Sequence, residues 1–230
     1  MLAADLRAGR RGKNWTQAEA AGRLGVAQSY LSMLERGQRR LPSELALRAA
    51  KVYAVPPTAV PRSPRRSRVR FDASTLARDL AGLGYPAFGH LRSRGWTPKH
   101  PGEVLLAGLA QDELEPRLVE ALPWLVVRYW MLDWSWVVAE AKAQDLQNRL
   151  GYVVSLARQL AERARDPRRT QTLAAVEAQL DRSRLAREDT LCRASLPAAE
   201  HRWLADHRPE GAQHWNLLTD WTTDALRYTT

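Results

Sequence analysis

Hydrophobic positions recur at three- and four-residue steps along most of the chain, which is the period of amphipathic α-helices. From Leu2 to about Val60 this pattern is divided into short segments, because residues that favour turns interrupt it at 11–14, 24–26, 36–42 and 55–57. Short helices joined by such turns predict a compact helical bundle.

The helical period resumes at about residue 72 and continues to the end of the chain. Glycine should end a short first helix at Gly84, and Pro123 should interrupt or kink a later one. The expected helices cover residues 75–84, 101–114, 115–130, 133–165 and 167–193, followed by two shorter ones within 197–228.

Two of these helices have informative patterns. The segment 133–165 contains no proline and carries a continuous apolar stripe, so we expect one long amphipathic helix there. The next helix, begun at Asp166-Pro167, should lie on the surface or pair with another chain, because its stripe contains only Leu173, Val176 and Leu180. Neither an alternating strand pattern nor a repeat is visible, and the predicted fold class is all-α.

Tryptophan is concentrated in the larger part of the chain, since eight of the nine tryptophans lie after residue 72. The spacing of Trp130, Trp134 and Trp136 favours packing in a helix-bundle core, where aromatic side chains bury large areas. An aromatic-lined pocket for a small molecule is the alternative.

Positive charge is concentrated in the first third of the chain. Residues 1–70 hold 15 Lys and Arg against 4 Asp and Glu, whereas residues 71–230 hold 20 against 21. A phosphate-binding module attached to a neutral partner module would show this segregation, and a solvated basic surface is the alternative.

The segment Pro61–Arg70 contains two prolines, two serines and five arginines. It cannot bury apolar surface, so we interpret it as a tether, with an arm that follows a nucleic-acid groove as the alternative. The predicted organisation is a small domain at 1–60, a basic Pro/Arg linker at 61–71 and a larger helical domain at 72–230.

Composition excludes several classes of protein. Hydrophobic residues make up 45% of the chain, which is ample for packed cores, while the mean hydropathy of -0.44 argues against a membrane span. The start of the chain shows no secretory signal, so we expect a cytoplasmic location. Cys192 has no second cysteine for a disulfide or a multi-cysteine metal site, and we expect it to be an ordinary helix residue.

One segment of the small domain has a specific local signature. Thr16 begins a capping box, in which its hydroxyl accepts a hydrogen bond from the Glu19 amide and Glu19 reaches back to the Thr16 amide. The expected helix runs from Gln17 to about Arg23. Gly25 then suits the left-handed conformation of a tight turn.

The helix that follows this turn has two unlike faces. Ala27, Leu31 and Leu34 share one side, which should be buried. The opposite side should be exposed and carries Gln28, Ser29, Ser32, Met33 and Arg36.

The run "TQAEAAGRLGVAQSYLSMLERGQRRLPSELALRAAKVYAV" resembles the helix-turn-helix of the Xre family, the group of the phage lambda and 434 repressors and Cro, over about residues 2–60. The matching features are Thr-Gln at the start of the second helix, Leu-Gly-Val in the turn, Gln at the start of the recognition helix, Leu-Glu-x-Gly at its end and a basic loop before a fourth helix. The resemblance implies a lambda-repressor-like bundle that places one helix in the major groove of DNA.

The resemblance also implies roles for individual residues. Gln28 would pair with adenine through both ends of its amide, and Gln17 would brace Gln28 while binding a phosphate. Arg10 and Glu35 occupy the positions of the family's partly buried ion pair and would be scaffold. The implied base readers are Gln28, Ser29, Ser32 and Met33, and the implied phosphate contacts are Thr16, Gln17, Arg36, Arg39 and Arg40.

The sequence departs from the family pattern at two places. Met33 stands where relatives often carry a polar base reader, so it offers apolar contact, for instance with a thymine methyl group. Ala20-Ala21-Gly22 replaces a bulkier pattern, which lightens the core and puts a helix-weakening glycine in the last turn of its helix.

No catalytic constellation is visible. The chain lacks a glycine-rich phosphate loop, a zinc-binding histidine pair on one helix and a cysteine pair. His201 and His207 are expected at the surface. We therefore expect no enzyme, no metal and no cofactor.

These observations favour a sequence-specific DNA-binding regulator, a repressor that reads an inverted repeat of double-stranded DNA as a homodimer and is nucleoid-associated through that binding. A dimer is expected because one reader contacts few base pairs; half-sites would lie about 34 Å apart or a multiple of it. The candidate dimer interfaces are the helix 133–165 and the helix from Pro167.

The segments Val119–Val138 and Ala141–Arg158 resemble regulators that accompany nucleotidyltransferase-like toxins, which implies an autoregulating antitoxin with a co-encoded toxin as partner. One alternative is a ligand-sensing repressor with a small-molecule pocket in its tryptophan-rich domain. Another is an interaction protein, or an unrecognised enzyme, that is tethered to DNA.

Overall fold

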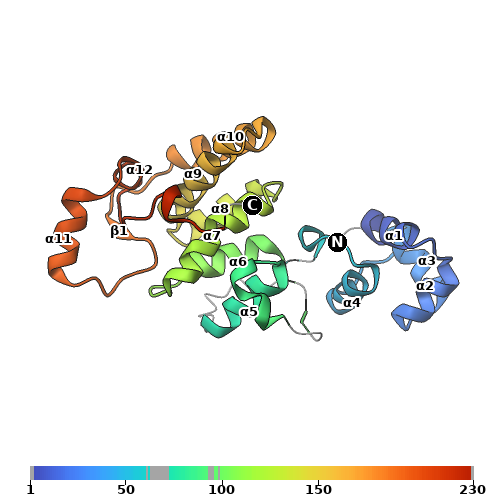
Figure 1. Ribbon diagram of the computed structural model, residues 1–230. Coiled ribbons are helices and arrows are strands. Elements are labelled where there is room, and N and C mark those ends of the chain that lie inside the picture. Colours follow the sequence, from blue (N-terminus) through green and yellow to red (C-terminus); the bar gives the residue numbers. More distant parts are fainter. Residues whose placement is uncertain (1–2, 61, 63–72, 93–95, 98, 229–230) are drawn as a thin grey trace. The chain divides into compact units, whose positions relative to one another are not determined.

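The computed structural model describes residues 3–60, 62, 73–92, 96–97 and 99–228. Helices dominate these residues, as the all-α class requires (Figure 1). They fall into two compact units, which hold the described parts of Met1–Arg66 with Ser93–His100 and of Ser67–Arg92 with Pro101–Thr230. The domain limits 1–60 and 72–230 stay predictions, and the linker at 61–71 lies outside the described residues except for Arg62.

The first unit is a bundle of short helices around one apolar cluster. Leu6, Leu24, Leu31 and Tyr53 meet in this cluster and are almost fully buried. Gly9 permits close packing at Tyr53, since a Cβ atom there would lie 2.8 Å from Cδ2 of the tyrosine ring. The elements are α1 (Ala3–Gly12), α2 (Gln17–Leu24), α3 (Gln28–Glu35), α4 (Ser43–Tyr53) and the 3₁₀ turn η1 (Pro57–Ala59).

The larger unit is built around α9 (Gln147–Arg163), which is buried on nearly all sides of its first three turns. α7 and α10 pack against it, and α9 and α10 lie side by side in Figure 1. The other elements are α5 (Ala73–Leu83), η2 (Pro86–Leu91), α6 (Pro101–Leu109), α7 (Pro116–Arg128), α8 (Trp134–Ala143), α10 (Pro167–Asp181), β1 (Asp189–Thr190), α11 (Ala198–His207), α12 (Glu210–His214), β2 (Leu217–Leu218) and η3 (Thr223–Ala225).

The expected single helix at 133–165 is wrong, because the chain breaks between α8 and α9. Asp145 adopts a left-handed conformation with φ of 58°, and the Leu146 amide donates to the Ala141 carbonyl at 2.8 Å. This pattern ends a helix, and aspartate tolerates the conformation better than most residues. The apolar stripe continues across the break because both helices bury a face in the same core.

The expected helix at 167–193 is also too long, since α10 ends at Asp181. Its thin stripe is confirmed, because Leu173, Val176 and Leu180 are its buried residues. Beyond it the chain turns back onto α9, where Asn148 donates to the Leu185 carbonyl at 2.9 Å and accepts from the Leu185 amide at 2.8 Å. These bonds replace the helical bonds that the backbone gives up.

The helix expected at Cys192 is wrong as well. Cys192 lies in a turn after β1, which pairs in parallel with β2, and it adopts a φ of 58°. Its side chain is completely buried, and this burial raises the pKa of the thiol to about 12. The thiol is therefore protonated and unreactive at neutral pH.

The tryptophans are only partly in the core. Trp124, Trp134 and Trp215 are buried, whereas Trp203 is 51% exposed. Of the three closely spaced tryptophans at 130, 134 and 136, Trp134 is buried, whereas Trp130 and Trp136 are half-buried and lie at the edge of the core rather than inside it. The turn between α7 and α8 places Trp130 outside a helix, which removes it from the face that the spacing implied.

Candidate nucleic-acid interface

The start of α2 is held by a capping box. Thr16 Oγ1 accepts a hydrogen bond from the Glu19 amide at 3.2 Å, and Glu19 Oε2 accepts from the Thr16 amide at 2.8 Å. The backbone hydrogen bond from Thr16 is the main reason why the pKa of Glu19 lies below its ordinary value. Two free amides of the first turn are thereby satisfied, which stabilises the beginning of the helix.

A tight turn joins α2 to α3. Gly25 has a φ of 65°, a left-handed conformation that glycine adopts without steric cost, and the Val26 amide donates to the Ala21 carbonyl at 3.0 Å. Arg48 of α4 donates to the Leu24 carbonyl at 2.9 Å. The angle between the two helices is therefore set by local backbone bonds and by one contact from α4.

α3 has one buried and one exposed face. Leu31 and Leu34 are buried as expected, together with Glu35. Ala27 was expected on the buried face but is exposed, because it precedes the helix as its N-cap in an extended conformation. Gln28 and Ser29 are exposed in the first turn, and Ser32 and Met33 are half-buried.

Glu35 is the buried anchor of a polar network that joins α1 to α3. Arg10 donates to both of its carboxylate oxygens, from Nε to Oε1 at 2.6 Å and from Nη2 to Oε2 at 2.9 Å, and Arg10 Nη1 donates to the Trp15 carbonyl at 2.9 Å. The Glu35 side chain is 1% exposed. Burial works to raise the pKa of Glu35, but hydrogen bonds from Arg10 and Gln17 outweigh it, so the pKa lies below its ordinary value of 4.5.

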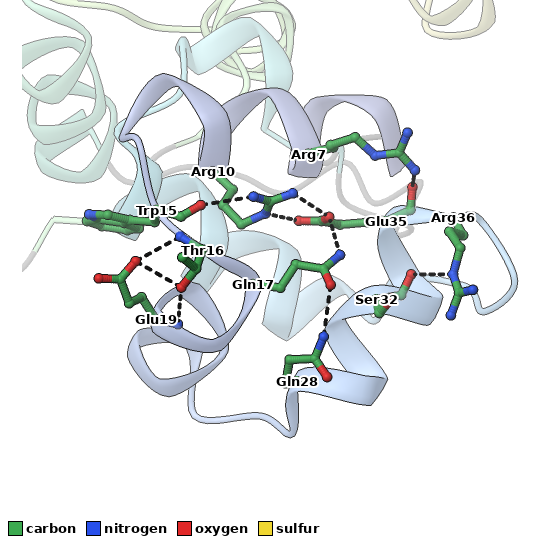
Figure 2. A network of polar contacts seen from close by, with 10 residues as sticks. All are labelled: Arg7, Arg10, Trp15, Thr16, Gln17, Glu19, Gln28, Ser32, Glu35 and Arg36. Carbon is green, nitrogen blue, oxygen red and sulfur yellow. Dashed lines mark hydrogen bonds and ion pairs between the residues drawn. The ribbon is translucent and has the colours of Figure 1, made fainter.

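Two glutamines extend this network to the surface. Gln17 Nε2 donates to Glu35 Oε2 at 2.9 Å, and Gln28 Nε2 donates to Gln17 Oε1 at 2.9 Å (Figure 2). The structure therefore brings together Arg10, Gln17, Gln28 and Glu35, four residues that the sequence had singled out. Gln28, the last of them, is exposed at the first turn of α3.

The remaining predicted contact residues lie outside this network, on α3, in the loop that follows it and, for Thr16, at the N-cap of α2. Ser29 and the arginines Arg36, Arg39 and Arg40 are exposed. Arg36 Nε donates to the Ser32 carbonyl at 3.3 Å, which positions its guanidinium beside the last turn of the helix. An exposed polar helix face next to a basic loop suits a polyanion, with side chains for both base edges and phosphates.

Sequence reasoning missed two contributors. Arg7 Nη2 donates to the Glu35 carbonyl at 2.6 Å, so two arginines of α1 hold the end of α3. Tyr30 is half-buried and packs against the buried cluster, although it follows the exposed residues Gln28 and Ser29. The spacing of Arg7 from Arg10, one turn apart on α1, was a signal that both face the same neighbour.

A helix that exposes a braced glutamine after a glycine turn, next to a basic loop, is the geometry of a helix-turn-helix DNA-binding domain. Residues 6–60 match the family model described as helix-turn-helix, which is a model of the Xre-like lambda repressor and Cro group. The match supports a DNA-binding transcription regulator. No curated protein and no solved structure matches the chain.

No helix in the part of the chain that the structure describes is long and apolar enough to span a membrane. Within the same residues, no group of three or more His, Cys, Asp or Glu side chains is placed to hold a metal ion.

Proposed function

We propose that the protein is a sequence-specific repressor, in which residues 1–60 read DNA and residues 72–230 form the dimerisation and effector domain. The observation that carries the proposal is the exposed face of α3, where Gln28 is held by Gln17 and followed by Ser29. In a helix-turn-helix domain, the N-terminal residues of such a helix contact the base edges in the major groove.

The base readers in this proposal are Gln28, Ser29, Ser32 and Met33. Gln28 pairs with adenine, whose N7 accepts and whose N6 donates in the major groove, and Met33 contacts a thymine methyl group. Phosphate contacts come from Thr16, Gln17, Arg36, Arg39 and Arg40. Gln17 Nε2 donates one of its two N–H groups to Glu35, and its second N–H can donate to a phosphate. Because Gln17 Oε1 accepts from Gln28, the same amide both braces Gln28 and contacts the DNA backbone.

The proposed assembly is a homodimer on an inverted repeat in the cytoplasm. α9 is not available as an interface because its apolar residues are buried within its own unit. α10 remains the candidate, since it has one buried stripe and exposes its other sides. An autoregulating antitoxin with a co-encoded toxin is the finer form of this proposal, and no catalytic activity is part of it.

A ligand-sensing repressor is the second candidate, favoured by a pocket of about 420 Å³ in the larger unit. Trp221 lies in its wall, so its fluorescence should change when a compound binds there. The lining residues are Glu113, Leu114, Pro116, Val119, Leu191, Cys192, Arg193, Asp220 and Trp221.

The repressor proposal is tested by mobility shift of the full chain on its own promoter, compared with random DNA. Gln28→Ala should weaken promoter binding by about 1 to 3 kcal/mol and leave random DNA nearly unchanged. Arg39→Ala should weaken both similarly and reduce the slope of log affinity against log salt by about 1. Equal loss on both DNAs for Gln28→Ala would remove the base-reading role of Gln28.

A further inference from the structure

In the polar network at α3, the group at the buried end determines which side chain donates and which accepts in each following hydrogen bond. Glu35 is ionised at neutral pH and its carboxylate carries no proton, so both of its oxygens can only accept hydrogen bonds. One side of Oε2 receives Arg10 Nη2 at 2.9 Å and the other receives the Gln17 amide at 2.9 Å. Gln17 must therefore point its nitrogen, and not its oxygen, at Glu35.

The orientation of the Gln17 amide in turn fixes that of the Gln28 amide. An amide whose nitrogen is committed to one partner presents its oxygen on the other side, and the Gln17 oxygen lies 2.9 Å from Gln28 Nε2. Gln28 then has to donate as well. A terminal amide by itself rotates by half a turn at little cost, so an isolated glutamine has no such constraint.

The Gln28 amide forms the exposed end of the network, where a base would bind. With one N–H of Gln28 used toward Gln17, the exposed amide retains its Oε1 acceptor and its second N–H donor (Figure 2). That pair complements adenine, whose N6 donates and N7 accepts, whereas guanine offers acceptors at both N7 and O6. An amide rotated by half a turn would present both N–H groups and complement guanine.

We infer that Glu35 determines the base preference of the site through a hydrogen-bond relay, Glu35 to Gln17 to Gln28, which fixes the Gln28 amide in the orientation that matches adenine. The inference rests on the proposed DNA-reading function. Glu35 and Gln17 are positioning residues for Gln28 in this relay, and Glu35 itself touches no DNA because its side chain is 1% exposed.

Two substitutions at one position test the direction. Gln17→Met keeps the approximate size of the side chain and removes both bonds, so Gln28 is free to rotate. Gln17→Lys places an ammonium between Glu35 and Gln28; it donates to both, so Gln28 must accept with Oε1 and present its two N–H groups. The adenine preference should become weak in Gln17→Met and should change to guanine in Gln17→Lys.

The measurement is selection from a randomised double-stranded oligonucleotide library by the full chain, followed by sequencing. The position read by Gln28 is the one whose preference disappears in Gln28→Ala. At that position we expect adenine over guanine in the wild type by about tenfold or more, the discrimination of a bidentate pair. Gln17→Met should bring this ratio to within about twofold of one.

Gln38→Lys is the matched control, because Gln38 is exposed in the basic loop and lies outside the relay. It adds the same charge and should raise affinity for all sequences while keeping the adenine preference. Adenine preference retained in Gln17→Met, or any base other than guanine in Gln17→Lys, overturns the relay. If Gln28→Ala changes no position of the selected sequence, the proposed function fails, and the relay fails with it.

Discussion

Each of the two units contains an arginine–carboxylate pair with one buried member, Glu35 in the small unit and Arg149 in the larger one, but the two pairs have different roles. In the small unit the Arg10–Glu35 pair continues through two glutamines to the protein surface. In the larger unit Arg149 uses its donors internally, on both oxygens of Asp189 at 2.7 and 2.8 Å and on the carbonyls of Leu109 and Gln111 at 2.9 Å.

An arginine–carboxylate pair can thus hold a side chain in place at the protein surface, or it can join distant segments inside a fold. The α1–α3 network leaves an unused donor and acceptor at its outer end, where a ligand can complete it. The Arg149 cluster joins α9, the end of α6 and β1, three segments far apart in the chain, and satisfies loop carbonyls that would otherwise be buried without partners.

Arg149→Met should have the largest effect, a loss of about 4 kcal/mol in the free energy of unfolding, because it leaves Asp189 and two backbone carbonyls without their partner. Tryptophan fluorescence in a urea titration reports mainly this unit, since seven of the nine tryptophans belong to it. The control is Arg163→Met, whose pair with Asp224 is 54% and 78% exposed and should contribute less than about 1 kcal/mol. Similar losses in both variants would contradict the closing role of Arg149.

Arg10→Met should destabilise the small unit by about 3 kcal/mol, because the buried Glu35 carboxylate loses two hydrogen bonds and its counter-charge. Hydrogen exchange resolved by peptide should show faster exchange within residues 3–60. Peptides from 101–228 should exchange as in the wild type. Loss of protection in both units would mean that the two networks are not independent.

Gly151→Ala should cost about 2 kcal/mol in the larger unit, because the added Cβ would overlap the ring of Trp215. Trp215 is 1% exposed and has little space to move. The measurement is again the midpoint of urea unfolding by fluorescence. An unchanged midpoint would show that this contact between α9 and the segment after α12 is loosely packed.

Acid should weaken the small unit by less than Arg10→Met does, because protonated Glu35 keeps part of its hydrogen bonding. The folded-state pKa of Glu35 is lower than its ordinary value of 4.5, so its stabilisation is complete above pH 4.5 and is lost as the pH falls through the folded-state pKa. The stability difference between the wild type and Glu35→Gln should therefore shrink below pH 4.5. A difference that is constant from pH 7 to pH 3 would contradict this assignment.

Gly22→Ala should give the smallest change, a gain of about 0.5 to 1 kcal/mol in the small unit. Gly22 lies in α2 with open space around it, so alanine adds helix propensity without a clash. Gly25→Ala is the matched comparison, since the φ of 65° there should make the same replacement destabilising. Hydrogen exchange of peptides from residues 3–60, measured at increasing temperature, should show higher protection in Gly22→Ala and lower protection in Gly25→Ala. A change of the same sign in both variants would be incompatible with these backbone conformations.

Much of the small unit could be predicted because its signals are local. The capping box at Thr16 and the turn at Gly25 each involve residues three or four apart, and the structure contains both. The family resemblance over residues 2–60 is matched by the helix-turn-helix family model over 6–60. The hydrogen bond between Gln17 and Glu35 was not predicted, since 18 residues separate the two and no short pattern links them.

In the larger unit the sequence determined the helical class, the start of α10 at Asp166-Pro167 and its buried stripe, because periodicity and proline act on neighbouring residues. Tertiary structure decided that the chain breaks between α8 and α9 and that α10 ends at Asp181. The bonds from Asn148 to Leu185 and from Arg149 to Asp189 span 37 and 40 residues, and they stabilise turns at positions where local propensity would continue a helix. The same physical reason applies to the Gln28 amide, whose orientation depends on the buried charge of Glu35 at the other end of α3, transmitted through Gln17 of α2.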